Sequence, residues 1–288
     1  MTRVLILVCV AVLAGCVPPT GNPRYELGRP YQVRGFWFYP HETYTLDDTG
    51  LASVFGPNHA PLTANGEVFD QTIVMAGHPT IQLPAIARLT NLENGRSILI
   101  RINDRGAGNP GRLADVTRRT ATLLAMRDNI ATRVRLQVLP GESRAATDGL
   151  AGRPVLAVAV APRGAVTSSA LPPPPGVRSQ AGLVGQATKP AAPNDVAASV
   201  GRLPETVTQE SANPRRLWVR LDTFEDYQYA AVQRARMAHL GAGIGEGFDG
   251  KLHRFWARIG PMDNVRQAED AMNDAFARGI PDARIVVE

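Results

Sequence analysis

The stretch SILIRINDRG, residues Ser97 to Gly106, decides the fold of the central part of the chain. Ile98, Ile100 and Ile102 alternate with their neighbours, and this period of two predicts a half-buried β-strand. The run then stops at Asn-Asp-Arg-Gly, which is a turn signal. Asp104 therefore sits where a rigid strand opens into a loop. That place suits a simple turn, and it equally suits a catalytic carboxylate held by a sheet.

Similar short segments surround this strand between residues 50 and 139. They alternate with Gly, Pro and Asn turns, and the clearest are GLASVF, AIARLTN, SILIRIN and TRVRLQVL. One helix is expected from about Asp115 to Met126, with apolar side chains on one side and arginines outward. So many short strands in one small region predict a closed β-barrel.

The composition sets broad limits. The chain has 288 residues, which is enough for about two domains. Its formal net charge is +5, nearly all of the positive charge coming from Arg. This mild excess suits contact with an anionic polymer or a membrane surface without naming either.

The N-terminus indicates export. An apolar run from Val4 to Leu13 follows Arg3 and is too short to span a bilayer, so it indicates a secretory signal. It ends in Leu-Ala-Gly-Cys16, which resembles the lipobox of bacterial lipoproteins. That resemblance implies a signal peptide at residues 1–15 and lipid on Cys16. The alternative is an ordinary signal peptide with a chance cysteine.

Two further features concern the compartment. Val17 is not the Asp that commonly marks inner-membrane retention, which favours an outer-membrane lipoprotein facing the periplasm. Cys9 lies inside the segment that would be removed, so the mature chain has no pair of thiols for an intramolecular disulfide.

Two segments flank the predicted barrel. Residues 16–49 form a tether and an aromatic-rich extension that we expect to pack on the barrel or against a partner. Residues 140–214 hold eleven of the 23 prolines, with many Ala, Ser and Gly, and predict a disordered Pro/Ala-rich linker. The apolar island PVLAVAV at 154–160 is the one part of it that could be a strand.

Residues 215–288 contain an internal repeat with an offset of 38 residues, in which Trp218 matches Trp256 and Gly241 matches Gly279. Each unit predicts a strand and then a helix, and a last strand follows. The sequence therefore predicts a ferredoxin-like βαββαβ sandwich. The two tryptophans are expected in the core or on a sheet face, with sugar stacking as the minority alternative. Eleven basic and eleven acidic residues balance here, which argues against a nucleic-acid module.

Three segments together resemble the rare lipoprotein A family: LTANGEVFD (62–70), TNLENGRSILIRINDRG (90–106) and GRLADVTRRTATLLAM downstream. The resemblance implies a double-psi β-barrel at residues 50–139. Residues 215–288 resemble a SPOR domain, a module that binds peptidoglycan stripped of its peptides. The expected fold class is thus mostly β, with an α+β module after the linker.

The resemblance also implies an activity. Active members of the family are lytic transglycosylases that cleave the bond between N-acetylmuramic acid and N-acetylglucosamine in peptide-free glycan strands, leaving 1,6-anhydro ends. A member is expected at the division septum, with glycan strands and division-site proteins as partners. No cofactor or metal is expected, because the five histidines are scattered without ligand spacing.

The family's acidic pair falls on Glu67 and Asp104. We predict Asp104 as the general acid/base, because a strand end places a side chain well, and Glu67 as an electrostatic or orienting helper. The reverse assignment stays open. Asp115 is either a third carboxylate in the groove or the first residue of a helix, favoured there by the helix dipole, and we favour the helix.

The remaining candidates are substrate-binding residues, each with a structural alternative. His78 would bond a carboxylate or sugar, or would be a polar residue on the barrel rim. Arg105 would bind substrate carboxyl groups, or would be solvated. Asn103 and Thr63 would bond sugars or build turns. Phe55 keeps one ring where the family has Trp-Tyr, while Val54 replaces the tryptophan.

A second function stays open, that of a non-catalytic septal peptidoglycan-binding lipoprotein. Geometry separates the two functions. Two carboxylates facing one open cleft within about 10 Å would indicate catalysis. Carboxylates that point apart, or that are covered and paired with arginines, would indicate binding only.

Overall fold

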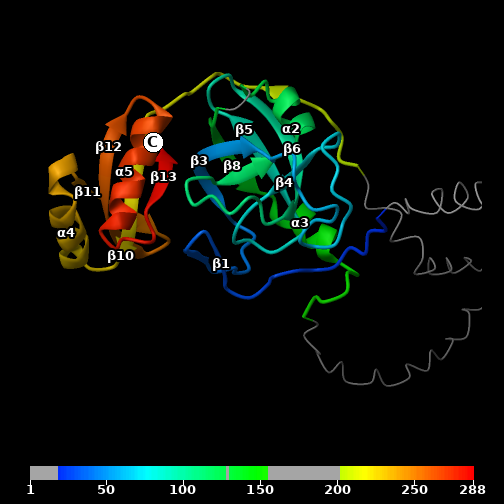
Figure 1. The fold of residues 1–288 in the computed structure, drawn as a ribbon, viewed down its shortest axis with the longest axis horizontal. Coiled ribbons are helices and arrows are strands. Elements are labelled where there is room, and N and C mark those ends of the chain that lie inside the picture. Colours follow the sequence, from blue (N-terminus) through cyan, green and yellow to red (C-terminus); the bar gives the residue numbers. More distant parts are fainter. Residues whose placement is uncertain (1–18, 128–129, 155–201) are drawn as a thin grey trace, which may run out of the picture. The chain divides into compact units, whose positions relative to one another are not determined.

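The structure, a computed structural model, describes residues 19–127, 130–154 and 202–288 (Figure 1). The predicted signal peptide, Cys16 and nearly all of the apolar island at 154–160 lie outside these ranges. Within them, no helix is both long enough and apolar enough to cross a bilayer.

Six strands close into a mixed β-barrel in the order β4-β7-β3-β8-β5-β6, and pairing of β4 with β6 completes the ring. Two of the pairings are parallel, β3 with β7 and β4 with β6, and the others are antiparallel. This closed mixed barrel is consistent with a double-psi β-barrel. The strands are β3 (Asp47–Val54), β4 (Met75–Gly77), β5 (Ala85–Asn91), β6 (Arg96–Asp104), β7 (Ala114–Val116) and β8 (Thr132–Val138).

The core of the barrel follows the alternation seen in the sequence. Ile98, Ile100 and Ile102 of β6 are fully or almost fully buried, while Leu99 and Arg101 between them are partly exposed. Burying such side chains contributes about 1.5–3 kcal/mol each, so the alternation fixes which face of β6 points inward.

The four longer barrel strands lie where the sequence predicted them, but β4 and β7 were not predicted, because three residues cannot show a period. The predicted helix is shorter than expected. It runs as α2 from Arg118 to Leu123, and Thr117 caps it by accepting a hydrogen bond from the backbone N–H of Thr120. Asp115 therefore lies in β7 and not at a helix start, so our preferred interpretation of Asp115 was wrong.

The predicted linker contains ordered elements at both ends. Helix α3 (Pro140–Thr147) packs on β5, where the Ser143 hydroxyl exchanges hydrogen bonds with the backbone N–H and C=O of Ile86, each at 2.9 Å. Strand β9 (Thr208–Gln209) pairs with the start of β6. The described structure thus extends past residue 139 and resumes before residue 215.

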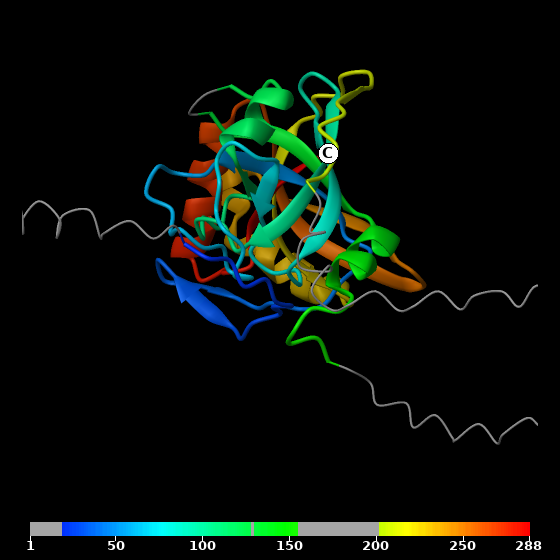
Figure 2. The ribbon, with the colours of Figure 1, turned by 90° about the vertical axis from the view of Figure 1, so that its right-hand side faces the viewer.

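The N-terminal extension packs on the barrel, one of the two arrangements expected for it. Its backbone bonds to residues 65, 66 and 83, and Tyr25 is buried. It then forms a hairpin of β1 (Tyr31–Val33) and β2 (Phe36–Phe38). Figure 2 shows this hairpin in blue at the margin of the barrel.

The C-terminal part has the predicted strand-helix-strand-strand-helix-strand order, with an antiparallel sheet in the order β11-β12-β10-β13. Both helices contact β10 and β12 and bury a small-residue face that includes Ala230, Ala268 and Ala275. The elements are β10 (Leu217–Phe224), α4 (Tyr227–Arg236), the short helix η1 (Ala238–Leu240), β11 (Gly243–Asp249), β12 (Leu252–Met262), α5 (Val265–Ala277) and β13 (Arg284–Val287).

Candidate active site

Asp104 ends strand β6 directly after an irregularity in the pairing with β4. Ala76 opposes Ile102 and Gly77 opposes Asp104, so Asn103 is an extra residue in the strand. Such a bulge re-aims the side chains around it and is common beside active sites. The backbone thus turns Asp104 toward the loop that follows Leu62 in the sequence.

The Asp104 carboxylate is held at both oxygens. Oδ2 accepts the backbone N–H of Ala64 at 2.9 Å, and Oδ1 accepts the backbone N–H of Gly106 at 2.8 Å. His59 Nε2 lies 3.4 Å from the same Oδ1. Asp104 is therefore a buried, well-anchored carboxylate whose nearest side-chain cation, when protonated, is a histidine.

His59 is fixed by its surroundings, and no motif in the sequence singles it out. Its ring stacks on Phe69 with centroids 3.7 Å apart and meets the edge of Phe55 at 5.1 Å. Nδ1 lies 2.7 Å from the carbonyl oxygen of Ala60, and since a carbonyl only accepts, Nδ1 carries the hydrogen. The approach of Nε2 to Asp104 is then favourable only when one of these two groups carries a further proton.

Glu67 lies in a different environment. Arg101 Nη2 approaches its Oε1 at 2.7 Å, and the side-chain amides of Asn65 and Asn103 donate to it at 2.7 and 2.8 Å. Burial acts to raise the pKa of Glu67. The positive charge and hydrogen bonds of Arg101, together with the hydrogen bonds from the two amides, outweigh burial and leave the pKa below its usual value. This covered, arginine-paired carboxylate suits an orienting role and does not suit proton donation.

One loop connects the two acids. Residues 63–67 give the N–H of Ala64 to Asp104 and the amide of Asn65 to Glu67. Thr63 is buried, and its hydroxyl donates to Asn65 Oδ1 at 2.8 Å, so Thr63 builds this loop. The Asn103 amide nitrogen is likewise taken by Glu67, which makes Asn103 part of the same network.

Asp115 is a third carboxylate beside the site. It lies in β7 opposite Gly77, and its Oδ2 accepts the backbone N–H of Ala107 at 2.7 Å. Burial raises the pKa of Asp115, and the nearby charge of Asp104 raises it further, while the Ala107 N–H and Arg112 oppose the shift. The Asp115 carboxyl group is therefore easier to protonate than an ordinary aspartate.

Gly106 makes this approach of strand and loop possible. Its φ of +78° is a left-handed conformation, and a Cβ at this position would lie 2.7 Å from Asp115 Oδ2. Gly106 therefore allows the loop after Asp104 to lie close to the Asp115 carboxylate.

His78 supports the rim of the barrel. Its ring nitrogen Nδ1 accepts the backbone N–H groups of Thr80 and Ile81 at 3.2 and 3.3 Å, and the backbone N–H of His78 donates to the backbone carbonyl of Asp104 at 2.9 Å. Burial, helped by the charge of Arg105, lowers the pKa of His78 to about 3. His78 is therefore a neutral histidine near pH 7, the rim residue of the two alternatives.

Two residues predicted to bind substrate are engaged by other parts of the protein. Arg105 gives Nη2 to the backbone carbonyl of Leu27 at 2.6 Å and Nη1 to that of Ile81, so it clamps the N-terminal extension and is not solvated. Phe55 is only 3% exposed, because its ring packs on His59 and Phe69. The Phe55 ring is therefore covered, and the guanidinium of Arg105 is engaged by backbone carbonyls.

The sequence of the barrel matches one known family. Residues 47–136 match a family model described as Lytic transglycolase. The similarity is that of this segment to the family. The matched segment contains Glu67, Asp104 and Asp115, together with His59.

Several curated proteins named endolytic peptidoglycan transglycosylase RlpA are similar to the chain. The one from Rickettsia felis is 34% identical over 128 residues, which are 43% of this chain and 56% of that protein. The one from Yersinia pestis is 37% identical over 120 residues, 39% of this chain and 33% of that protein. The one from Pseudomonas aeruginosa is 28% identical over 279 residues, 92% of this chain and 79% of that protein. The chain thus covers a third to about half of the first two.

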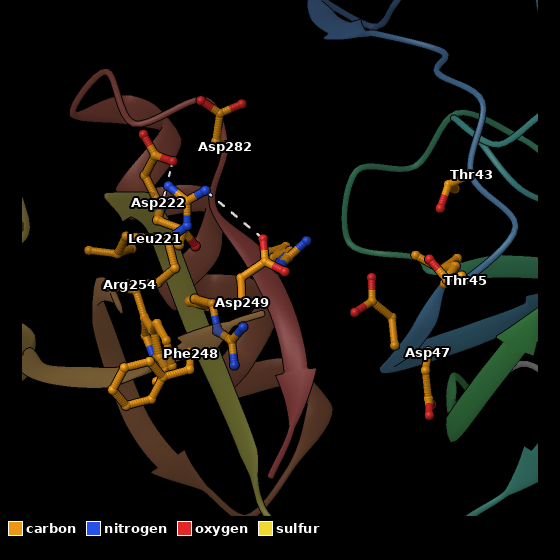
Figure 3. A pocket seen from close by; sticks show the side chains of 16 residues that line it. Thr43, Thr45, Asp47, Leu221, Asp222, Phe248, Asp249, Arg254 and Asp282 are labelled. Atoms are coloured by element: carbon orange, nitrogen blue, oxygen red, sulfur yellow. Dashed lines mark hydrogen bonds and ion pairs between the residues drawn. The ribbon is translucent and has the colours of Figure 1, made fainter. Parts of the chain in front are cut away.

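The C-terminal part carries a second cluster, on the sheet face opposite α4 and α5. Arg258 lies over Trp218 at 4.2 Å, Arg220 lies over Trp256 at 4.4 Å, and Glu288 pairs with both arginines. Figure 3 shows Arg254 of the same face beside Asp249, with an ion-pair distance of 4.0 Å. Both tryptophans are thus half-buried sheet-face residues.

Glycines of β11 fit this arrangement. A Cβ at Gly245 would lie 2.4 Å from the indole nitrogen of Trp256, and one at Gly247 would lie 2.9 Å from the other end of the ring. The alternating glycines in GIGEGFD therefore give the Trp256 ring the space to lie flat on the neighbouring strand.

Proposed function

We propose that the protein is an endolytic peptidoglycan lytic transglycosylase. It cleaves the bond between N-acetylmuramic acid and N-acetylglucosamine in peptide-free glycan strands and forms 1,6-anhydro ends. The match of residues 47–136 to the lytic transglycolase family and the names of the similar proteins support this assignment. The observation that carries it is the anchored Asp104, with His59 Nε2 at 3.4 Å and Asp115 beside the following loop.

The reaction needs one proton to move out and one to return. A proton held between Asp104 Oδ1 and His59 Nε2 passes to the glycosidic oxygen as its bond to the muramic acid C1 breaks. The C6 hydroxyl of the same sugar attacks C1, and its proton returns to the pair. No water is consumed, and the enzyme ends in its starting state.

The other carboxylates assist this pair. Asp115 adds a buried carboxyl group beside the loop that follows Asp104, and the repulsion between the two groups, when both are ionised, favours keeping one proton in the site. Glu67 holds Asn65 and Asn103 by hydrogen bonds. Asn65 follows Ala64, whose backbone N–H binds Asp104, and Asn103 directly precedes Asp104. Glu67 is thus a positioning residue and not the proton donor.

The ends of the chain place the enzyme. We propose that lipid on Cys16 tethers it to the outer membrane, facing the periplasm, and that residues 215–288 are a SPOR domain that brings it to peptide-free glycan at the division septum. The Leu-Ala-Gly-Cys motif supports the first point, and the strand-helix repeat with its observed element order supports the second. A binding module on a tether raises the local concentration of substrate at the barrel.

A product assay tests the enzyme. The mature protein is incubated with peptide-free glycan strands, and anhydro-muramic ends are sought by mass spectrometry. Wild type is expected to release them and Asp104→Asn is expected to release at least about a hundredfold fewer, in the range of a lost acid/base group. Equal product from wild type and Asp104→Asn would contradict the proposal.

One observation favours the second candidate, a non-catalytic septal binding protein. Glu67 is covered and paired with Arg101, the arrangement expected for binding only. The same assay separates the two functions, since a binding protein retains glycan in a sedimentation assay while releasing no anhydro product.

A further inference from the structure

The hairpin of β1 and β2 is anchored beside the proposed site. The Tyr31 hydroxyl donates to the carbonyl of Pro79 at 2.9 Å, and its ring stacks on Phe38 at 5.3 Å. Val33 packs on Gly108, where a Cβ would lie 2.6 Å from its side chain. One face of the hairpin is therefore fixed to the loop that follows Asp104.

The opposite face of the hairpin is aromatic and open. Trp37 and Tyr39 are 56% and 61% exposed, and their rings stack with centroids 6.4 Å apart and an interplanar angle of 27°. Two large rings exposed side by side are unusual on a soluble surface and mark a binding site more often than scattered single residues do. Trp and Tyr combine an apolar ring face with a polar group, which matches a pyranose with its C–H face and hydroxyl edge.

A cation stands at the tip of the same hairpin. Arg34 is exposed, holds a left-handed φ of 52°, and makes no ion pair with any residue that the structure describes. Its neighbour Val33 packs on Gly108, so the tip lies beside the loop that follows Asp104. N-acetylmuramic acid carries a lactyl carboxylate, so the tip complements the charge of a peptide-free strand.

We infer that this hairpin is a carbohydrate subsite, in which Trp37 and Tyr39 stack sugar rings of a peptide-free glycan strand remote from the cleaved bond and Arg34 binds a muramic carboxylate. The inference rests on the proposed function for its ligand. Continuity with the Asp104 loop, the paired exposed rings and the charge at the tip favour a glycan over a protein partner. The subsite adds affinity for long strands and takes no part in the proton transfers.

Footprinting tests the contact without needing turnover. The full chain carrying Asp104→Asn is exposed to hydroxyl radicals with and without long peptide-free glycan strands, and labelling is measured by mass spectrometry. Labelling of Trp37 and Tyr39 is expected to fall when glycan is present. Tyr229 on α4, which is 62% exposed, is the matched control and is expected to keep its labelling. Unchanged labelling of the hairpin rings would overturn the inference.

Kinetics tests the role. The double variant Trp37→Ala/Tyr39→Ala is expected to raise KM for long strands about tenfold, the loss typical of truncating an interface aromatic, with kcat unchanged. Trp37→Phe/Tyr39→Phe, which keeps both rings, should restore most of the affinity, and Tyr229→Ala should match wild type. A double alanine variant with wild-type KM would overturn the subsite. Absence of product from wild type would instead overturn the proposed function, and the footprint would still report on the hairpin.

Discussion

At the scale of single residues, the site divides into groups that hold and a pair that can move a proton. Arg105, His78 and Glu67 each have their polar atoms engaged by neighbouring groups, so they fix the frame of the barrel mouth. Asp104 and His59 differ, because Asp104 Oδ1 and His59 Nε2 face each other at 3.4 Å and can share a single proton. The sequence pointed to the motif residues, but it could not distinguish a holding group from a proton-transfer group. That distinction depends on contacts across the fold.

His59 should therefore matter as much as a motif residue. We expect His59→Gln to lower kcat on glycan strands by about 10²–10³-fold, because a positioned acid/base partner contributes on that scale. KM should change little, since no sugar contact is removed. His239→Gln, on the exposed 3-10 helix η1, provides a matched control and should leave kcat unchanged. Turnover of His59→Gln at the wild-type rate would remove His59 from the mechanism.

Glu67 should matter for stability in a pH-dependent way. Its pKa in the folded state is lowered, so its stabilising contribution is present above the ordinary value of about 4.5 and is lost as pH falls through the folded pKa. At pH 7, Glu67→Gln should lose about 3 kcal/mol of unfolding free energy, because Arg101 is left without its buried partner. As pH falls below about 4.5, wild type should lose stability more steeply than the variant, which has no carboxylate at this position to protonate.

Urea unfolding at several pH values checks this expectation. Glu93→Gln removes a surface pair with Arg127, which is 66% exposed, and should change the unfolding free energy by less than about 1 kcal/mol. If wild type and Glu67→Gln followed parallel curves from pH 7 to 3, the folded-state pKa of Glu67 would not be lowered.

At the scale of elements, long periodic segments were predictable and short ones were not. AIARLTN matches β5 residue for residue, because seven residues carry a clear strand signal. MAG and ADV are too short to show one, yet β4 closes the barrel and β7 carries Asp115. Asp115 does not benefit from the helix dipole, because α2 begins only at Arg118 with Thr117 as its N-cap. A site built from strand ends across a barrel is set by pairing register, which one sequence does not display.

The turn after β6 offers a test at this scale. Gly106→Ala should destabilise the protein by about 1–3 kcal/mol and lower activity, because φ is +78° and the new Cβ would push against Asp115. Gly141 in α3 has no atom within 4 Å of a new Cβ, so Gly141→Ala should stay within about 0.5 kcal/mol of wild type. Thermal unfolding and the anhydro-product assay, run on both variants, measure the two effects. Equal melting temperatures for the two variants would argue against the close packing of this turn.

At the scale of the whole molecule, the order of segments was predictable from composition and repetition, while the sheet face of the C-terminal part needed coordinates. The repeat predicted that Trp218 and Trp256 occupy equivalent strand positions. It did not predict that each would lie beneath an arginine and that Glu288 would join the two arginines. Under the proposed function, this face is where we expect the C-terminal part to bind a glycan strand.

Trp256→Ala in the full chain tests whether the C-terminal part retains glycan while the barrel cleaves it. Loss of the ring that underlies Arg220 should weaken sedimentation with peptide-free sacculi about tenfold, as for a central interface aromatic. Release of anhydro ends from short soluble fragments should stay at the wild-type rate, because such fragments gain nothing from a second attachment point. Val232→Ala, on the exposed side of α4, is the control and should change neither measurement. If the Trp256→Ala variant sediments like wild type, glycan retention does not depend on this sheet face. If the variant loses activity on short fragments, the two parts do not act separately.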